Sequence, residues 1–170
     1  MDNFTHIITK IQEKILTALM AIIVLDVTWQ IFTRFVMRDP SSFSEELAGF
    51  LLIWIGLLGA SYALYTRAHL GIDILTHNLT GTKRKISESL IYIIVLVFAL
   101  FVLVIGGLRL VILTFTLNQI SPSLGIAMGY IYIVLPLTGL LMIYYSIVFI
   151  IKALRDESIV PDESAITSID

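Results

Sequence analysis

A run of twenty residues without a charged side chain, from position 47 to position 66, constrains this chain more than any other feature. At about 1.5 Å per residue, a helix of that length spans the roughly 30 Å hydrocarbon core of a bilayer. Ser42, followed three residues later by Glu45, predicts a capping box at the start of this helix, where acidic side chains also suit the helix dipole. We therefore predict a membrane-spanning helix over residues 43–66.

The composition of the whole chain is that of a membrane protein. Hydrophobic residues make up 58% of its 170 positions and charged residues 14%, against about 25% charged in soluble domains. The net charge of -2 predicts no nucleic-acid partner, and the absence of cysteine excludes disulfides, thiolate metal sites and cysteine nucleophiles. The length leaves no room for a soluble catalytic module, so we do not expect an enzyme.

Apolar runs and the polar breaks between them predict an all-α integral membrane fold with four spans. The expected spans are residues 15–37, 43–66, 87–117 and 124–151. We also expect an amphipathic lead-in at 1–14, an amphipathic helix in the membrane interface at 68–80 and a disordered polar tail at 152–170. Pro136 should kink the fourth helix, and the first helix is expected to be retained rather than cleaved as a signal peptide.

The positions of the basic residues predict the orientation of these spans. Eight basic residues fall on the side that holds both termini, and two fall on the other side. The positive-inside rule therefore predicts that both termini are cytoplasmic. The eight are Lys10, Lys14, Arg67, Lys83, Arg84, Lys85, Lys152 and Arg155, and the two are Arg34 and Arg38.

Two charges lie well away from the ends of the predicted spans, and a charge costs about 2.5 to 3.5 kcal/mol at the centre of a membrane helix. Asp26 lies eight residues before Arg34, and Arg109 lies nine residues before Asn118. Both are therefore expected about 12 to 14 Å below the outer ends of their helices. Equal depth and opposite sign predict an ion pair between Asp26 and Arg109 that clamps the first helix to the third. A proton or substrate relay is the alternative interpretation.

Glu45 and Glu46 are predicted at the outer face, close to Arg34 and Arg38. They could bind a cation or recognise a periplasmic partner, or they could cap the helix and form interfacial salt bridges. The histidines His6, His69 and His77 all fall in interfacial segments. Because axial haem ligands in a membrane bundle would lie inside the spans, we expect no haem, and the sequence predicts no catalytic, cofactor or metal site.

Small residues four positions apart predict close helix packing, either between these helices or against a partner. The pairs are Gly56 with Ala60, Gly59 with Ala63, and Gly125 with Gly129. Trp29 and Trp54 lie well inside their predicted spans, which favours protein contact over anchoring at the lipid interface.

A set of residues centred on positions 44–73 gives the chain a family resemblance. The set comprises Arg34, Ser44-Glu45-Glu46-Leu47-Ala48, Trp54, Gly59-Ala60, Tyr62-Ala63, Arg67, His69-Leu70-Gly71-Ile72-Asp73 and Lys83-Arg84. With its four spans, the chain resembles the DctQ-like small membrane subunit of a tripartite ATP-independent periplasmic (TRAP) transporter over about residues 10 to 155.

The resemblance implies a bacterial inner-membrane protein that binds a much larger membrane subunit. In that family picture the large, elevator-type subunit holds the substrate and sodium sites, and a separate periplasmic protein captures an organic acid such as a dicarboxylate or sialic acid. The small subunit is then a scaffold in contact with membrane lipid and helps to dock the periplasmic protein. The resemblance assigns Arg34, Glu45, Glu46, Arg67, His69 and Asp73 to structural or interface positions.

Two other classes of function are open on the residues alone. One is a self-sufficient, proton-coupled exporter that works as a homodimer, with Asp26 as the binding carboxylate. Against it stand the polar loop between the second and third helices and Arg109 as a neutralising charge. The other is an inert membrane anchor for a redox or signalling complex.

Overall fold

The computed structural model describes residues 2–38, 41–66 and 82–154, and in these it is helical apart from loops and one isolated bridge. Four helical stretches are long and apolar enough to cross a membrane, as the sequence predicts: Thr5–Met37, Ser42–Tyr65, Ser89–Thr116 and Met128–Lys152. The elements are α1 (Asp2–Phe32), the π-helix η1 (Thr33–Met37), α2 (Ser42–Tyr65), α4 (Thr82–Phe98), the π-helix η2 (Ala99–Gly106), α5 (Gly107–Thr116), α6 (Met128–Tyr132) and α7 (Val134–Leu154).

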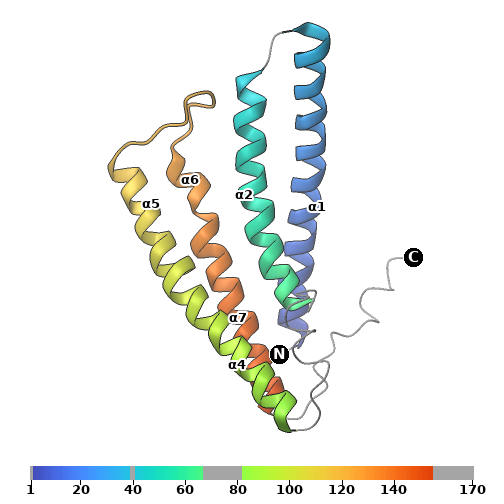
Figure 1. Cartoon of the computed structure of the whole chain (residues 1–170), viewed down its shortest axis with the longest axis vertical. Helices are drawn as coiled ribbons and strands as arrows, with labels where there is room; N and C mark the ends of the chain where they lie inside the picture. The colour runs from blue at the N-terminus through green and yellow to red at the C-terminus, as the bar shows by residue number, and fades with distance from the viewer. Residues whose placement is uncertain (1, 39–40, 67–81, 155–170) are drawn as a thin grey trace, which may run out of the picture.

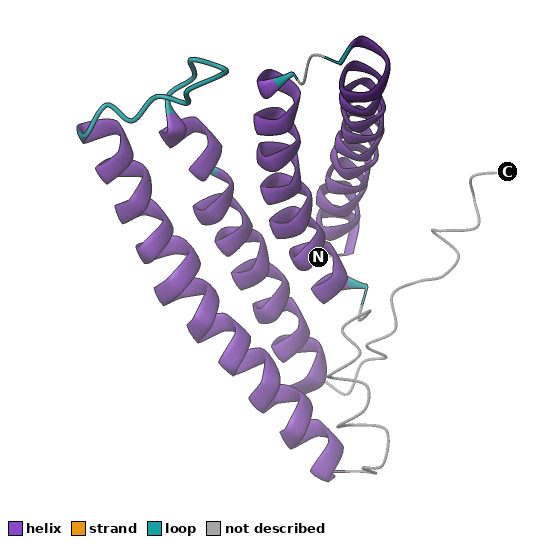
Figure 2. Cartoon of the chain, turned by 45° about the horizontal axis from the view of Figure 1, so that its top comes forward, coloured by secondary structure: helices purple, strands orange, loops and turns teal. Residues whose placement is uncertain are grey.

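The helices form two antiparallel hairpins that lie side by side (Figure 1). The first hairpin joins α1 to α2, and the second joins the continuous helix α4–η2–α5 to α6 and α7. We call the end with the starts of α1 and α4 the terminal end, and the end with Arg38, Ser41 and residues 117–127 the loop end. Figure 2 shows the second hairpin tilted against the first.

The centre of the bundle is α7, which packs on α2, α4, η2 and α5. Half of the most apolar part of the Met128–Lys152 stretch, which includes α7, is buried inside the protein, against 6% for the Thr5–Met37 stretch that includes α1. Its buried residues join those of α2, α4 and η2 in one apolar core. That core contains Leu64, Tyr92, Ala99, Leu103, Met142, Tyr145 and Phe149.

Helix starts differ from the sequence predictions where local backbone chemistry decides them. The N-cap of α2 is Ser41, whose Oγ accepts a hydrogen bond from the Ser44 amide at 3.4 Å, so the predicted capping box of Ser42 and Glu45 is not formed. The lead-in expected at 1–14 is continuous with α1. At the other terminus α7 continues to Leu154, past the predicted start of the tail.

The fourth helix starts at Met128, four residues later than predicted. Residues 117–127 form a tight loop in which the Ser121 amide donates to the Ile126 carbonyl oxygen at 2.9 Å and Ile120 pairs with Ala127. Gly125 has a φ of +66°, which suits a turn and not a helix. The expected kink appears as a break at Ile133 between α6 and α7, three residues before Pro136, because the proline ring excludes the carbonyl of the preceding turn. The predicted interfacial helix at 68–80 and the tail from residue 155 lie outside the described residues.

Candidate partner interface

The terminal half of the bundle is held by a buried polar network centred on Gln12. The Gln12 side chain is 4% exposed. Its Nε2 donates to the Leu58 carbonyl oxygen at 2.8 Å and to Ser61 Oγ at 2.6 Å, and its Oε1 accepts from the Tyr145 hydroxyl at 2.8 Å. One amide therefore connects α1, α2 and α7.

Two threonines extend this network along α1. Thr5 Oγ1 lies 2.8 Å from the Tyr144 hydroxyl, and Thr9 Oγ1 lies 3.4 Å from the Tyr145 hydroxyl. Thr5, Thr9 and Gln12 recur at helical spacing, and all three are buried, whereas the neighbouring Ile7, Ile11 and Ile15 are exposed. The uncharged polar stripe of α1 thus points inward, as expected for helix contacts in a membrane, and its outer side carries isoleucines together with the exposed Lys10, Glu13 and Lys14.

At the loop end, Glu46 joins the two hairpins. Its Oε2 accepts hydrogen bonds from the amides of Ser123 at 2.8 Å and Leu124 at 3.1 Å, which lie in the 117–127 loop. Glu45 is exposed, and its carboxylate has no hydrogen bond among the described residues. Of the two neighbouring carboxylates, Glu46 therefore has a contact within the chain, and Glu45 faces outward.

The two arginines that were predicted to lie at the outer face are on η1 or next to it. Arg34 is exposed, and Arg38 ends η1 in the left-handed conformation, with its amide donating to the Thr33 carbonyl oxygen. η1 and the end of α1 extend past the start of α2 (Figure 1) and expose Phe35, Val36 and Met37. Arg67, His69 and Asp73, the other predicted interface charges, lie outside the described residues.

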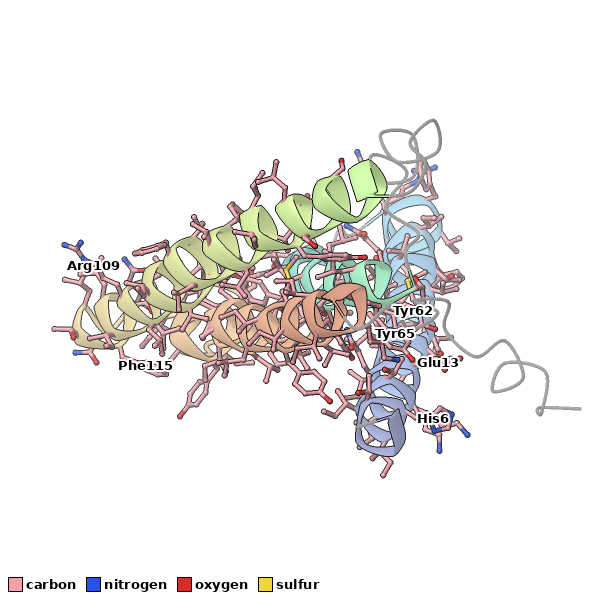
Figure 3. All side chains as sticks on the ribbon, turned by 90° about the horizontal axis from the view of Figure 1, so that it is seen from below. His6, Glu13, Tyr62, Tyr65, Arg109 and Phe115 are labelled. Carbon is pink, nitrogen blue, oxygen red and sulfur yellow. The ribbon has the colours of Figure 1, made fainter. Side chains whose placement is uncertain are left out.

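The structure does not bring Asp26 and Arg109 together. The Asp26 carboxylate lies beside Ser44, in the first turn of α2, and its Oδ2 is buried without a hydrogen-bond partner among the described residues. Arg109 is exposed on α5 and points away from the bundle, at the edge far from α1 (Figure 3). Depth along a helix does not determine which way a side chain points, and α5 packs on η2, α6 and α7 rather than on α1.

Of the glycines predicted from spacing to pack closely, Gly129 makes such a contact, and Gly139, which was not predicted, makes another. A Cβ on Gly129 would lie 2.6 Å from Phe115 Cζ, and a Cβ on Gly139 would lie 2.7 Å from Val104 Cγ2, so α6 and α7 approach the third helix closely. Gly56 and Gly59 were predicted to pack with Ala60 and Ala63. A Cβ added to either glycine would have no neighbour within 4 Å among the described residues. Gly125 is a turn residue rather than a packing partner of Gly129.

The two tryptophans also differ in their surroundings. Trp54 Nε1 donates to the Ile131 carbonyl oxygen at 3.2 Å, which connects the two hairpins within the membrane-spanning part. Trp29 is 54% exposed and stacks on Phe32 of the same helix, with ring centroids 5.9 Å apart. The predicted protein contact is therefore present for Trp54, and Trp29 faces the outside of the bundle.

The sequence of residues 15–156 matches the family model described as tripartite ATP-independent periplasmic transporters, DctQ component. The chain belongs to this family. A DctQ-family chain is a component of a TRAP transporter and not an enzyme.

Relatives with assigned roles agree with this membership. The sialic acid TRAP transporter small permease protein SiaQ of Vibrio cholerae is 32% identical over 143 residues, which cover 81% of this chain and 78% of SiaQ. The C4-dicarboxylate TRAP transporter small permease protein DctQ of Rhodobacter capsulatus is 30% identical over 106 residues, or 59% of this chain and 44% of that protein.

A third relative differs in length from the DctQ-family chains. The sialic acid TRAP transporter permease protein SiaT of Haemophilus influenzae is 32% identical over 119 residues, which are 68% of this chain and 18% of SiaT. In SiaT the segment similar to this chain is thus covalently joined to a much longer polypeptide.

Sequence reasoning missed the Gln12 network of this DctQ-family chain. The signal was present, because Thr5, Thr9 and Gln12 form one polar stripe at spacings of four and three residues. In a water-soluble helix such a stripe faces solvent, and in a membrane helix it faces other helices. Tyr145 lies in a uniformly apolar stretch and gives no comparable signal.

Proposed function

We propose that this chain is the scaffold subunit of a sodium-coupled TRAP transporter for an organic acid of the sialic acid or dicarboxylate type, in a bacterial inner membrane. Its partner is the large membrane subunit, which carries the solute. The family and the two substrate-assigned small permeases support this proposal. The covalent joining of the matching segment to a longer chain in SiaT supports a stable association with a large partner.

The observation that carries the scaffold role is the bonding between the hairpins at both ends. Gln12 holds α1 to α2 and α7 at the terminal end, and Glu46 holds α2 to the 117–127 loop at the other end. A carrier must change the relation between its helices to move a solute, and contacts at both ends oppose such a change. Much of the outer surface is apolar and faces lipid or a partner.

The orientation adds a second part to the proposal. With both termini in the cytoplasm, the loop end faces the periplasm. Arg34 and Glu45 are exposed there, beside the apolar end of η1. We assign these residues to docking of the periplasmic substrate-binding protein, while Glu46 is used within the chain.

The test is reconstitution with the transporter's own components. The tagged chain is purified from its native membrane in mild detergent, and copurifying proteins are identified by mass spectrometry. Proteoliposomes are then made with the large subunit alone, this chain alone or both, and uptake of labelled sialic acid and succinate is measured with and without a sodium gradient. We expect uptake only when both subunits, the binding protein and sodium are present. Uptake by this chain alone that is lost on Asp26→Asn would refute the scaffold role.

A further inference from the structure

Arg109 is a charge on the outer, apolar surface of a membrane-spanning helix. It is exposed on α5, and the apolar residues one turn away on the same face are exposed as well: Ile105, Ile112 and Leu113 are 51%, 63% and 52% exposed. The end of α5 lies seven residues further on, at Thr116, so Arg109 is about 10 Å from the loop end of its helix. The guanidinium group is always protonated, and a charge at such a depth is rare unless it is paired.

The elements packed against α5 offer Arg109 no acidic neighbour among the described residues. α5 packs on η2, α6 and α7, and none of these four elements contains an acidic residue. Along the sequence, no acidic residue occurs between Glu88 and Asp156. Asp26 lies on the other hairpin, beside Ser44, with its Oδ2 buried. Among the described residues Arg109 therefore has no counter-charge, and a second molecule can supply one.

The local geometry favours a protein carboxylate over a lipid headgroup. In a helix, Cα–Cβ bonds tilt toward the N-terminus, and the N-terminal direction of α5 leads away from the loop end toward the middle of the span. The Cα–Cβ bond of Arg109 therefore starts in the direction away from the nearer headgroups. Gly106 lies three residues earlier and is also exposed. A Cβ added to Gly106 would have one described neighbour within 4 Å, the Phe101 carbonyl oxygen of the same helical stretch, so a neighbouring helix has room to approach.

We infer that Arg109 and the exposed face of α5 around it (Ile105, Gly106, Ile112 and Leu113) dock on the large membrane subunit through an Arg109–carboxylate pair inside the bilayer. This inference rests on the proposed function. An arginine can pair with a carboxylate through two parallel hydrogen bonds, and such a bidentate pair also fixes geometry. The pair accounts for the charge on an apolar face.

Two measurements test this. In the first, Arg109→Leu, Arg109→Lys and Arg109→Glu chains are copurified with the large subunit, and complex affinity is measured in lipid nanodiscs. We expect Arg109→Leu to weaken the complex about tenfold, Arg109→Lys to weaken it less and Arg109→Glu to weaken it more. Thermal unfolding of each isolated variant shows whether it still folds.

In the second, a photo-crosslinking amino acid replaces Ile112 in the otherwise unchanged chain, and Leu25, which is 70% exposed on α1, serves as the control. We expect crosslinks from position 112 to a segment of the large subunit that contains an acidic residue. Exchanging that acidic residue for arginine should restore binding to the Arg109→Glu chain.

Three results would overturn the inference. They are crosslinks from position 112 only to lipid, crosslinks to a second copy of this chain, and an Arg109→Leu complex as tight as the unaltered one. Those three results leave the proposed function standing, because the unaltered chain still forms its complex with the large subunit. If the unaltered chain forms no such complex, the proposed function fails as well. Failure of the inference alone is therefore distinguishable from failure of both.

Discussion

Replacing Gln12 with leucine removes the polar centre of the bundle while keeping a side chain of similar size. The amide makes three interhelical hydrogen bonds, to Leu58, Ser61 and Tyr145. In membrane proteins one such bond contributes about 0.6 kcal/mol on average and at most about 1.7 kcal/mol. The three together predict a loss of about 1.8 kcal/mol in the free energy of unfolding, or about 20-fold in the equilibrium constant.

The assay is reversible unfolding in dodecyl maltoside micelles titrated with SDS, followed by circular dichroism and tryptophan fluorescence. The matched control is Gln30→Leu, because Gln30 lies on the same helix and its side chain makes no hydrogen bond among the described residues. A double-mutant cycle with Tyr145→Phe should return a coupling of about 0.6 kcal/mol. An equal loss for Gln12→Leu and Gln30→Leu, or no coupling to Tyr145, would refute the network as a source of stability.

Two further predictions follow from the loop end and from the helix contacts. Glu46→Ala should speed hydrogen exchange at the amides of Ser123 and Leu124, which donate to the Glu46 carboxylate, whereas Glu45→Ala should leave their exchange rates unchanged. Equal exchange rates in the two variants would contradict the contact between Glu46 and the loop. Gly129→Ala should lower stability by about 1 to 3 kcal/mol, because its Cβ would meet the Phe115 ring. Gly56→Ala, with open space around its Cβ, should be neutral or raise stability by up to about 1 kcal/mol through helix propensity. A larger loss in Gly56→Ala than in Gly129→Ala in the same SDS titration would reverse the assignment of the packed glycine.

The sequence was sufficient for the features that depend on local chemistry. An uncharged run of membrane length specifies a span whatever it packs against, which is why the four spans were predicted with small errors at their ends. Two of the ends that moved depend on single residues: Ser41 rather than Ser42 caps α2, and the positive φ of Gly125 delays the fourth helix.

Features that depend on the direction of a side chain around its helix could not be predicted in the same way. Asp26 and Arg109 were paired by depth, yet they lie on different hairpins and point to different surroundings. Likewise, Gly56 and Gly129 each belong to a pair of small residues four positions apart, yet of these two glycines only Gly129 has a close neighbour among the described residues. Spacing identifies a face, and the neighbours of that face come from the tertiary structure.

The division between inward and outward polar groups has a consequence for assembly. Lipid is as apolar as leucine, so burial alone does not drive these helices together, and hydrogen bonds and close packing must do so. Gln12 and Glu46 supply that specificity inside the chain, while Arg109 has no partner among the described residues and faces outward. Membrane insertion depends on the apolar runs, which a Gln12→Leu or Arg109→Leu change leaves intact. The two variants should therefore both insert normally and fail at different later steps: Gln12→Leu in the arrangement of the hairpins, and Arg109→Leu only in the association with the large subunit.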